Sequence, residues 1–317
     1  MWTAVVLGSI IVGGYAAYAM WATAAVRDGA ALWPFVLAAP LVYFALPFAF
    51  TCIWMAFGWW WRAQAPTDVA LSFRHKLRLF GHEFASLAQS PLRMTFYWLL
   101  RDPPPAPADL PVLLVHGIGC NAGVWWGMRR DLAARGIAPV YTMSYGPPLA
   151  SIELFADQLA EKIAGIRAAT GAGQIVIVTH SMGGLVARAY LRRYGGAHVR
   201  RLITLGAPHQ GSRHAWMMFG APLAQMRPDN AFLVRLNADT ERAAGVPVVS
   251  LWSWHDSMVT PQTSSRLTWA ENIVIAGVAH NALLNDRGVW DRVAGEIRKA
   301  QTKEPRSVDA LRASTAN

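Results

Sequence analysis

The sequence has few charged residues and almost no cysteine. Charged side chains make up 15% of its 317 residues, whereas an average soluble domain has about 25%. The high hydrophobic content excludes an intrinsically disordered chain, and the composition also excludes collagen and a coiled coil. The only two cysteines, Cys52 and Cys120, exclude a disulfide scaffold. No C-x-x-C motif or histidine-rich run indicates a metal site.

Charge is missing mainly from the first fifth of the chain. Residues 1–61 contain one Arg and one Asp, Arg27 and Asp28, so the net charge of +10 belongs to residues 62–317. Uncharged apolar runs cover residues 2–26 and 31–61. Each can cross a bilayer once, because about 20 helical residues suffice. We therefore expect a transmembrane helical hairpin over residues 1–62, with its turn near residues 27–30.

Three prolines interrupt the second run: Pro34, Pro40 and Pro47. We expect them to confine the helix to the later part of the run or to kink it. An aromatic and basic cluster typical of an interfacial anchor ends the run: Trp59, Trp60, Trp61 and Arg62. Two alternatives stay open. The first run could be a signal cleaved at Ala17-Tyr18-Ala19, or the hairpin could be buried inside a soluble protein.

Residues 63–107 connect the hairpin to the rest of the chain. Residues 69–100 mix apolar and basic side chains, which is typical of an amphipathic helix at a membrane surface or of a helix packed on a domain. Residues 103–107 form a proline-rich linker. The basic residues that follow the hairpin place both of its ends in the cytoplasm by the positive-inside rule. Anionic lipid is the expected partner, and no motif indicates nucleic acid.

Residues 108–300 alternate strand and helix patterns. The predicted strands are 111–116, 138–144, 174–179, 201–205, 246–252 and 272–277. The predicted helices are 124–135, 151–168, 182–194 and 286–300. This alternation indicates an α/β fold with a doubly wound, mostly parallel sheet. A polar, flexible tail is expected over residues 301–317.

The interval between the fourth and fifth strands is longer than a crossover helix needs. We interpret residues 207–245 as a possible cap, with Trp216, Met217 and Phe219 contacting an acyl chain. Two packed helices without such a role are the alternative.

Ser181 lies where the third strand ends and a helix begins, in VIVTHSMGG (176–184). This arrangement predicts a nucleophile elbow, in which the positions two before and two after the serine must be small. Gly183 satisfies the second condition, whereas Thr179 replaces the usual glycine at the first. A helix N-terminus also stabilises nearby negative charge.

The first strand ends in LLVHGIG (113–119). Acyl transfer needs two donors for the developing oxyanion. We expect them to be the backbone N–H groups of Ile118 and Met182, with Gly117 permitting close approach of the backbone. His116 is then a structural residue, and Cys120 a packing residue.

Asp256 and His280 follow the fifth and sixth strands, at the sheet edge where open α/β folds place their sites. They also occur in the order serine, acid, histidine that a serine elbow requires. We predict that His280 is the base and Asp256 the acid. Rival bases and acids are less suitably placed: His180, His209, His214, His255, Asp229, Asp239 and Asp286.

Residues 111–284 resemble the α/β-hydrolase superfamily, and in particular bacterial triacylglycerol lipases and esterases. The matches are LLVHGIG, VIVTHSMGG, LITLGAPHQGS (202–212), WSWHDSMVTP (252–261) and GVAHNALL (277–284). The resemblance implies hydrolysis of carboxylic esters by Ser181, His280 and Asp256 through an acyl-enzyme, without a cofactor. Residues 1–100 lie outside it.

The sequence therefore predicts a membrane-anchored esterase or lipase for lipid-like esters, in a bacterial inner membrane with its catalytic domain in the cytoplasm. Two alternatives remain: an acyltransferase with the same triad, and an inactive membrane scaffold on a hydrolase fold.

Overall fold

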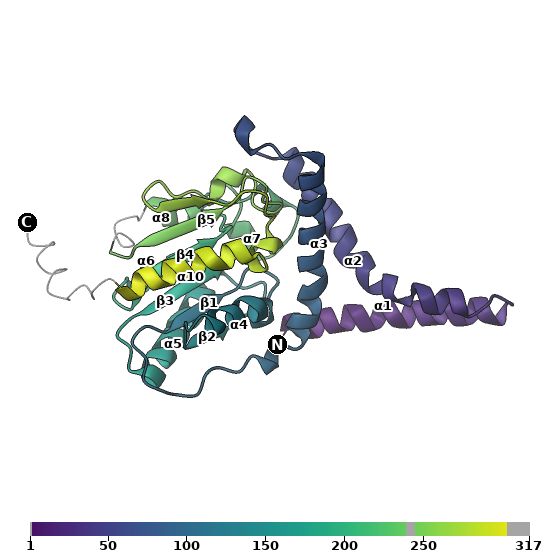
Figure 1. Ribbon diagram of the computed structural model, residues 1–317, viewed down its shortest axis with the longest axis horizontal. Helices are drawn as coiled ribbons and strands as arrows, with labels where there is room; N and C mark the ends of the chain where they lie inside the picture. The colour runs from purple at the N-terminus through teal and green to yellow at the C-terminus, as the bar shows by residue number, and fades with distance from the viewer. Residues whose placement is uncertain (1, 239–244, 303–317) are drawn as a thin grey trace, which may run out of the picture.

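The computed structural model describes residues 2–238 and 245–302. A six-stranded sheet forms the centre of the molecule, and a long helical hairpin projects away from it (Figure 1). The strands are β1 (Val112–Val115), β2 (Val140–Met143), β3 (Ile175–His180), β4 (Val199–Leu205), β5 (Val248–Trp252) and β6 (Glu271–Val274). All six predicted strands are present; β1, β2, β5 and β6 are shorter than expected, and β4 is longer.

The strands are parallel throughout, in the order β2-β1-β3-β4-β5-β6. Strand β1 is second from one edge; the chain adds β2 at that edge and then β3 to β6 in the opposite direction, so the predicted doubly wound parallel sheet is confirmed. Their carboxyl ends meet at one edge, where loops can gather side chains from distant parts of the sequence.

Helices cover both faces of the sheet because the side chains of a strand alternate in direction. Leu113 and Val115 pack in one core with α5 (Ile152–Thr170) and α6 (Met182–Tyr194). Val112 and Leu114 pack in a second core with α4 (Trp126–Ala134) and α10 (Arg287–Thr302). The predicted helices therefore correspond to observed ones.

Short helices occupy the connections. They are η1 (Thr67–Val69), η2 (Tyr97–Leu99), η3 (Ala122–Trp125), η4 (Arg213–Trp216), α7 (Ala221–Gln225), α8 (Ala231–Ala238), η5 (Gln262–Ser265) and η6 (Asn281–Leu284). The segment predicted as a cap contains η4, α7 and α8, and its residues 239–244 lie outside the described part. Of the predicted tail, residues 301–302 end α10 and the rest lies outside the described residues.

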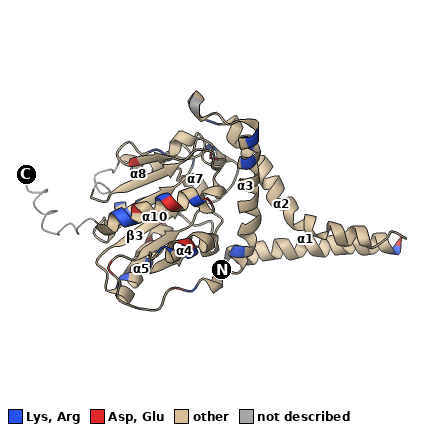
Figure 2. Cartoon of the chain, in the orientation of Figure 1, with Lys and Arg blue, Asp and Glu red and all other residues tan. Residues whose placement is uncertain are grey.

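The hairpin consists of α1 (Trp2–Arg27) and α2 (Trp33–Trp60). The hydroxyl of Tyr18 donates to the carbonyl of Phe35, and the Trp21 ring packs edge-on against Phe35 at 5.0 Å. Charged residues lie only near the tip of the hairpin and beyond its base (Figure 2). Both helices are long and apolar enough to cross a membrane.

The expectation that prolines confine the second helix to the later part of its run is wrong. Pro34 lies in the first turn of α2, where a missing N–H costs nothing, and the helix starts at Trp33. Pro40 and Pro47 lie inside the helix. Figure 1 shows that α2 bends along its length, as internal prolines generally cause.

Helix α3 (Phe73–Thr95) lies between the hairpin and the sheet domain (Figure 1). Phe80 and Phe84 pack on the Phe48 ring of α2 at 5.8 and 6.0 Å. On the other side, the carbonyl of Met94 accepts from the Asn121 side chain, beside η3. Helix α3 is therefore packed on both neighbours, as the second of the two interpretations left open by the sequence expects, whereas a place at a membrane surface stays a prediction.

Candidate active site

Ser181 stands in a sharp turn between β3 and α6. Its φ is 55° and its ψ is −128°, a conformation that costs free energy for any residue other than glycine. The N–H of Ser181 donates to the carbonyl of Leu205 at 2.9 Å, which ties the turn to the end of β4. A strained serine at the carboxyl end of a central strand is the geometry of a nucleophile elbow.

The glycines near Ser181 are required by close backbone approach. A Cβ at Gly183 would lie 2.6 Å from the carbonyl oxygens of Val115 and His116. A Cβ at Gly117 would lie 2.8 Å from the Cβ of Ser181. The turn after β1 therefore lies directly against the serine, and larger residues would separate them.

Thr179 fits the elbow despite its larger side chain. It is fully buried, and its hydroxyl donates to the carbonyl of Ile203 at 3.4 Å. Its Oγ1 would lie 3.4 Å from a Cβ placed at Gly184. This is ordinary van der Waals contact, so the start of α6 leaves room for the threonine side chain.

Asp256 and His280 form a buried pair. His280 Nδ1 donates to Asp256 Oδ2 at 2.9 Å, and both side chains are 2% exposed. The other carboxylate oxygen accepts from the N–H groups of Met258 and Val259 at 2.8 and 2.7 Å. The carboxylate is therefore held in one orientation, and it fixes the tautomer of the histidine.

Each side chain of this pair shifts the pKa of the other towards the charged form. Burial tends to raise the pKa of Asp256, but His280 and the N–H groups of Met258 and Val259 outweigh burial and lower it. Burial tends to lower the pKa of His280, but the carboxylates of Asp256 and Glu83 outweigh burial and raise it. Asp256 is consequently ionised at neutral pH, beside a histidine with a strengthened affinity for protons.

Two neighbours bring the elbow to this pair. The His180 ring, next to Ser181 in the chain, lies 4.6 Å from the His280 ring, and its Nε2 donates to the His280 carbonyl at 3.0 Å. A Cβ at Gly206, which follows Leu205, would lie 2.9 Å from Asp256 Oδ2. The three predicted triad residues therefore lie near one another at the carboxyl end of the sheet, and a hydrogen bond joins two of them, Asp256 and His280.

The residues predicted for the oxyanion site lie on both sides of the serine. Met182 begins α6 immediately after Ser181, and Ile118 follows Gly117 in the turn that contacts Ser181. The His116 ring stacks on Tyr145 at 4.1 Å, and burial lowers its pKa to about 4. Desolvation raises the pKa of the Cys120 thiol to about 12, so this cysteine is not a thiolate nucleophile.

The rival histidines have other partners. Burial, with a smaller effect of His280, lowers the pKa of His180 to about 3. His209 lies between Arg188 and Thr204, and the His214 Nδ1 lies 2.9 Å from the Thr260 hydroxyl. The Nδ1 of His255 accepts from the N–H of Gly277. None of these contacts joins a second histidine to Asp256.

The two rival acids that the structure describes have other surroundings. Asp286 accepts from the N–H of Val289, as a cap of α10 does. Asp229 lies in the turn before α8 and has a φ of 62°. Asp239 lies outside the described residues. Within the described part of the chain, no group of three His, Cys, Asp or Glu side chains is placed to hold a metal.

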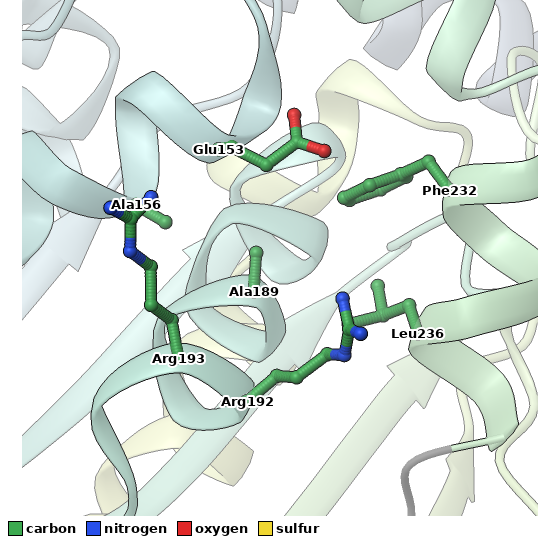
Figure 3. Close-up of a pocket in the computed structure, with 7 residues that line it drawn as sticks. All are labelled: Glu153, Ala156, Ala189, Arg192, Arg193, Phe232 and Leu236. Atoms are coloured by element: carbon green, nitrogen blue, oxygen red, sulfur yellow. The ribbon is translucent and has the colours of Figure 1, made fainter.

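The predicted acyl-binding residues are on the surface. Trp216 and Phe219 are 62% and 80% exposed, and the Arg227 guanidinium lies over the Trp216 ring. A cavity of about 320 Å³ lies elsewhere, between α5, α6 and α8, where Figure 3 shows the side chains around it. Its lining residues are Glu153, Ala156, Ala189, Arg192, Arg193, Phe232 and Leu236.

One residue near the site was not singled out from the sequence. The buried Glu83 of α3 accepts hydrogen bonds from Ser257 and Asn281, the residues that follow Asp256 and His280. One signal could have revealed it. Glu83 is the only acidic residue between Asp68 and Asp102, in a segment that is otherwise apolar and basic.

Comparison with known proteins identifies the fold. Residues 111–234 match the family described as alpha/beta hydrolase fold. The chain also resembles the mature form of the lipase BlEst2 of Bacillus licheniformis, with a TM-score of 0.52 and 18% identity over 61% of this chain and 96% of that protein. Together with the sheet order, these likenesses establish the α/β-hydrolase fold.

Two sequence relatives are closer. The chain is 32% identical over 118 residues to a triacylglycerol lipase of Pseudarthrobacter phenanthrenivorans and equally similar to one of Burkholderia plantarii. The matched segment is 33% of this chain and 35% and 31% of those lipases. The chain therefore spans about a third of the length of the relatives it matches.

Proposed function

We propose that this protein is a serine hydrolase of carboxylic esters. The observation that carries the proposal is the buried Asp256–His280 pair at 2.9 Å, beside a serine held at a φ of 55°. With Nδ1 bonded to Asp256, the Nε2 atom of the neutral His280 ring can accept the proton of the Ser181 hydroxyl. The deprotonated oxygen then attacks the ester carbonyl.

The negative charge that develops on the carbonyl oxygen must be stabilised by hydrogen-bond donors. In the proposed mechanism the N–H groups of Ile118 and Met182 supply them. Collapse of the tetrahedral intermediate expels the alcohol, which takes its proton from His280, and leaves the acyl group on Ser181. A water molecule, deprotonated by His280, then releases the acid and restores the serine.

We further propose that residues 1–62 anchor this enzyme in a membrane. The apolar side chains of α1 and α2 are largely exposed, with Met20 at 75% and Leu37 at 70%. A soluble protein rarely exposes so large an apolar surface. At the base of the hairpin, the Arg62 guanidinium lies 3.7 Å from the Trp59 ring, and Trp60 is 80% exposed. Such residues are common at a membrane–water interface.

The contacts of α1 favour its retention over cleavage as a signal. Thr3 donates to the carbonyl of Cys120, and Leu7 packs against the core of the sheet domain. Both contacts would be lost by cleavage after Ala19. We propose that the connector over residues 63–107 and the hydrolase domain over residues 108–300 lie on the cytoplasmic side of the membrane.

An anchored ester hydrolase meets apolar esters where they concentrate. The names of the two lipase relatives support this substrate class, and Trp216, Met217 and Phe219 remain the proposed contacts for an acyl chain. The anionic lipids of a bilayer suit the basic start of α3, where Arg74, Lys76 and Arg78 occupy every second position.

Labelling with a fluorophosphonate probe tests the proposal on the full chain in detergent. We expect Ser181 to be labelled, and Ser181→Ala to lose both labelling and hydrolysis of p-nitrophenyl esters by at least about a thousandfold. The melting temperature of the variant should stay within a few degrees of the parent. A folded parent protein without labelling would refute a serine hydrolase. Products formed with a competing alcohol distinguish acyl transfer from hydrolysis.

A further inference from the structure

Helix α3 contributes a buried carboxylate to the two loops that carry Asp256 and His280. Glu83 is 1% exposed. Its Oε1 accepts from the Ser257 hydroxyl at 2.8 Å and from the side-chain and backbone nitrogens of Asn281 at 2.9 and 3.2 Å. Its Oε2 accepts from the N–H of Ala282 at 2.9 Å. One side chain thus bridges the residue after the acid and the two residues after the histidine.

Two of these donors are backbone N–H groups in the first turn of η6, directly after His280. His280 precedes the first turn of η6, and its own side chain does not cap that helix. The first N–H groups of a helix need outside acceptors, and Glu83 accepts from those of Asn281 and Ala282. A residue almost 200 positions earlier in the sequence therefore fixes the backbone from which the His280 ring projects.

A buried carboxylate is costly unless its oxygens are fully hydrogen-bonded. In the described part of the chain no Lys, Arg or His forms an ion pair with Glu83, so N–H and O–H donors hold its charge. That charge acts on His280 as a neighbouring carboxylate does, favouring the imidazolium. An apolar side chain could pack α3 on the domain, but it would hold neither loop.

We propose that Glu83 is a positioning residue of the active site, which sets the relative placement of the Asp256 and His280 loops from the helix next to the membrane hairpin. This inference rests on the proposed serine hydrolase. It makes α3 part of the catalytic machinery, and it links the geometry of the site to the packing of the hairpin.

The charged and titratable groups around His280 decide how the proposal is tested. They are Asp256 in the acid loop, His180 in the elbow, His214 at the start of the cap segment and Glu83 on α3. Burial lowers the pKa of His180 to about 3 and that of His214 to about 4. Both therefore stay neutral over the pH range of the measurement, which leaves the two carboxylates as the charges that act on His280.

The test measures the rate of fluorophosphonate labelling of Ser181 as a function of pH, on the full chain in detergent. Glu83→Gln keeps the shape but presents an amide donor to one of the N–H groups. We expect the labelling rate to fall about tenfold to a hundredfold, since small misplacements of reacting groups cost that much. The acid limb of the profile should also move to lower pH, because a negative charge near His280 is lost.

Two further variants separate position from charge. Glu83→Asp retains the charge but is shorter by one methylene, so its rate should fall while its acid limb stays in place. Glu296→Gln is the matched control, since Glu296 is another buried carboxylate, paired with Arg201 and away from the triad. It should change neither the rate nor the limb.

The inference and the proposed function fail in different ways. An unlabelled parent protein refutes the hydrolase itself. A labelled parent with an unchanged rate and limb in folded Glu83→Gln refutes the role of Glu83 alone. If Glu83→Gln does not fold, Ser257→Ala, which removes a single donor, replaces it. A smaller fall in rate then supports the inference, and an unchanged rate overturns it.

Discussion

The hairpin and the sheet contain the same kinds of apolar residue, but these side chains are mostly exposed in the hairpin and buried in the sheet. All four side chains of β1 and all six of β3 are buried. In α1 and α2 most apolar side chains are exposed, and they meet one another at few places. The sheet uses its apolar residues to exclude water and build a core. The hairpin presents the same chemistry outward, as the proposed membrane anchor requires.

The base of the hairpin departs from this contrast. A Cβ at Gly58 would lie 2.8 Å from the Ser257 carbonyl oxygen, so α2 touches the acid loop directly. The rings of Trp54 and Trp61 lie 4.9 and 5.2 Å from that of His214. The hairpin and the sheet domain therefore share an interface at the loop that carries Asp256, although a proline-rich linker separates them in the sequence.

The largest effect should come from truncating matched leucines in the two regions. Leu114 is fully buried in β1, whereas Leu37 in α2 is 70% exposed. Leu114→Ala should lower the free energy of unfolding by about 2–5 kcal/mol, because it leaves a cavity. Leu37→Ala should lower it by little in detergent, which is as apolar as the side chain. Thermal unfolding of both purified variants measures the difference.

An equal loss in both variants would mean that Leu37 is packed against protein, as in the buried hairpin that the sequence left open. The anchor proposal would then be wrong, whatever the activity of the sheet domain.

A pair of glycines within the hairpin should give the next largest effect. Gly58→Val forces a side chain against the backbone of Ser257, and should lower ester hydrolysis about a hundredfold by displacing the acid loop. Gly13→Val adds the same side chain where nothing lies within 4 Å, and should leave activity unchanged. Equal activities would show that the base of the hairpin does not support the site.

The sequence was sufficient for the sheet, because strand and helix patterns and the residues at strand ends are local signals. Ser181, Asp256 and His280 could be located because each follows a strand whose apolar run is visible. Glu83 could not, since its role depends on how α3 packs across two loops almost 200 residues away. The expectation that Pro40 and Pro47 would shorten the second helix was wrong for a related reason. A long apolar helix outside the sheet tolerates bends that a strand or a short helix would not.

The smallest effect, and the one that separates the two regions by chemistry, is that of pH. Residues 1–61 contain no histidine, so association with liposomes should not change between pH 5.5 and 8. Activity should change, because protonated His280 cannot take the proton of Ser181. Asp256 and Glu83 raise the pKa of His280 against the effect of burial, so kcat/KM should fall as the pH drops through a value above 6.5, the usual value for histidine.

The free energy of unfolding should depend on pH in the opposite direction. The part of it that comes from protonated His280 is complete below pH 6.5 and is lost as the pH rises through the raised pKa. Ester hydrolysis and liposome flotation, measured on the same samples, test both statements. An acid limb below 6.5 would contradict the environment assigned to His280. Flotation that depends on pH would mean that histidines outside the hairpin, of which His75 and His82 of α3 are the nearest in the sequence, take part in anchoring.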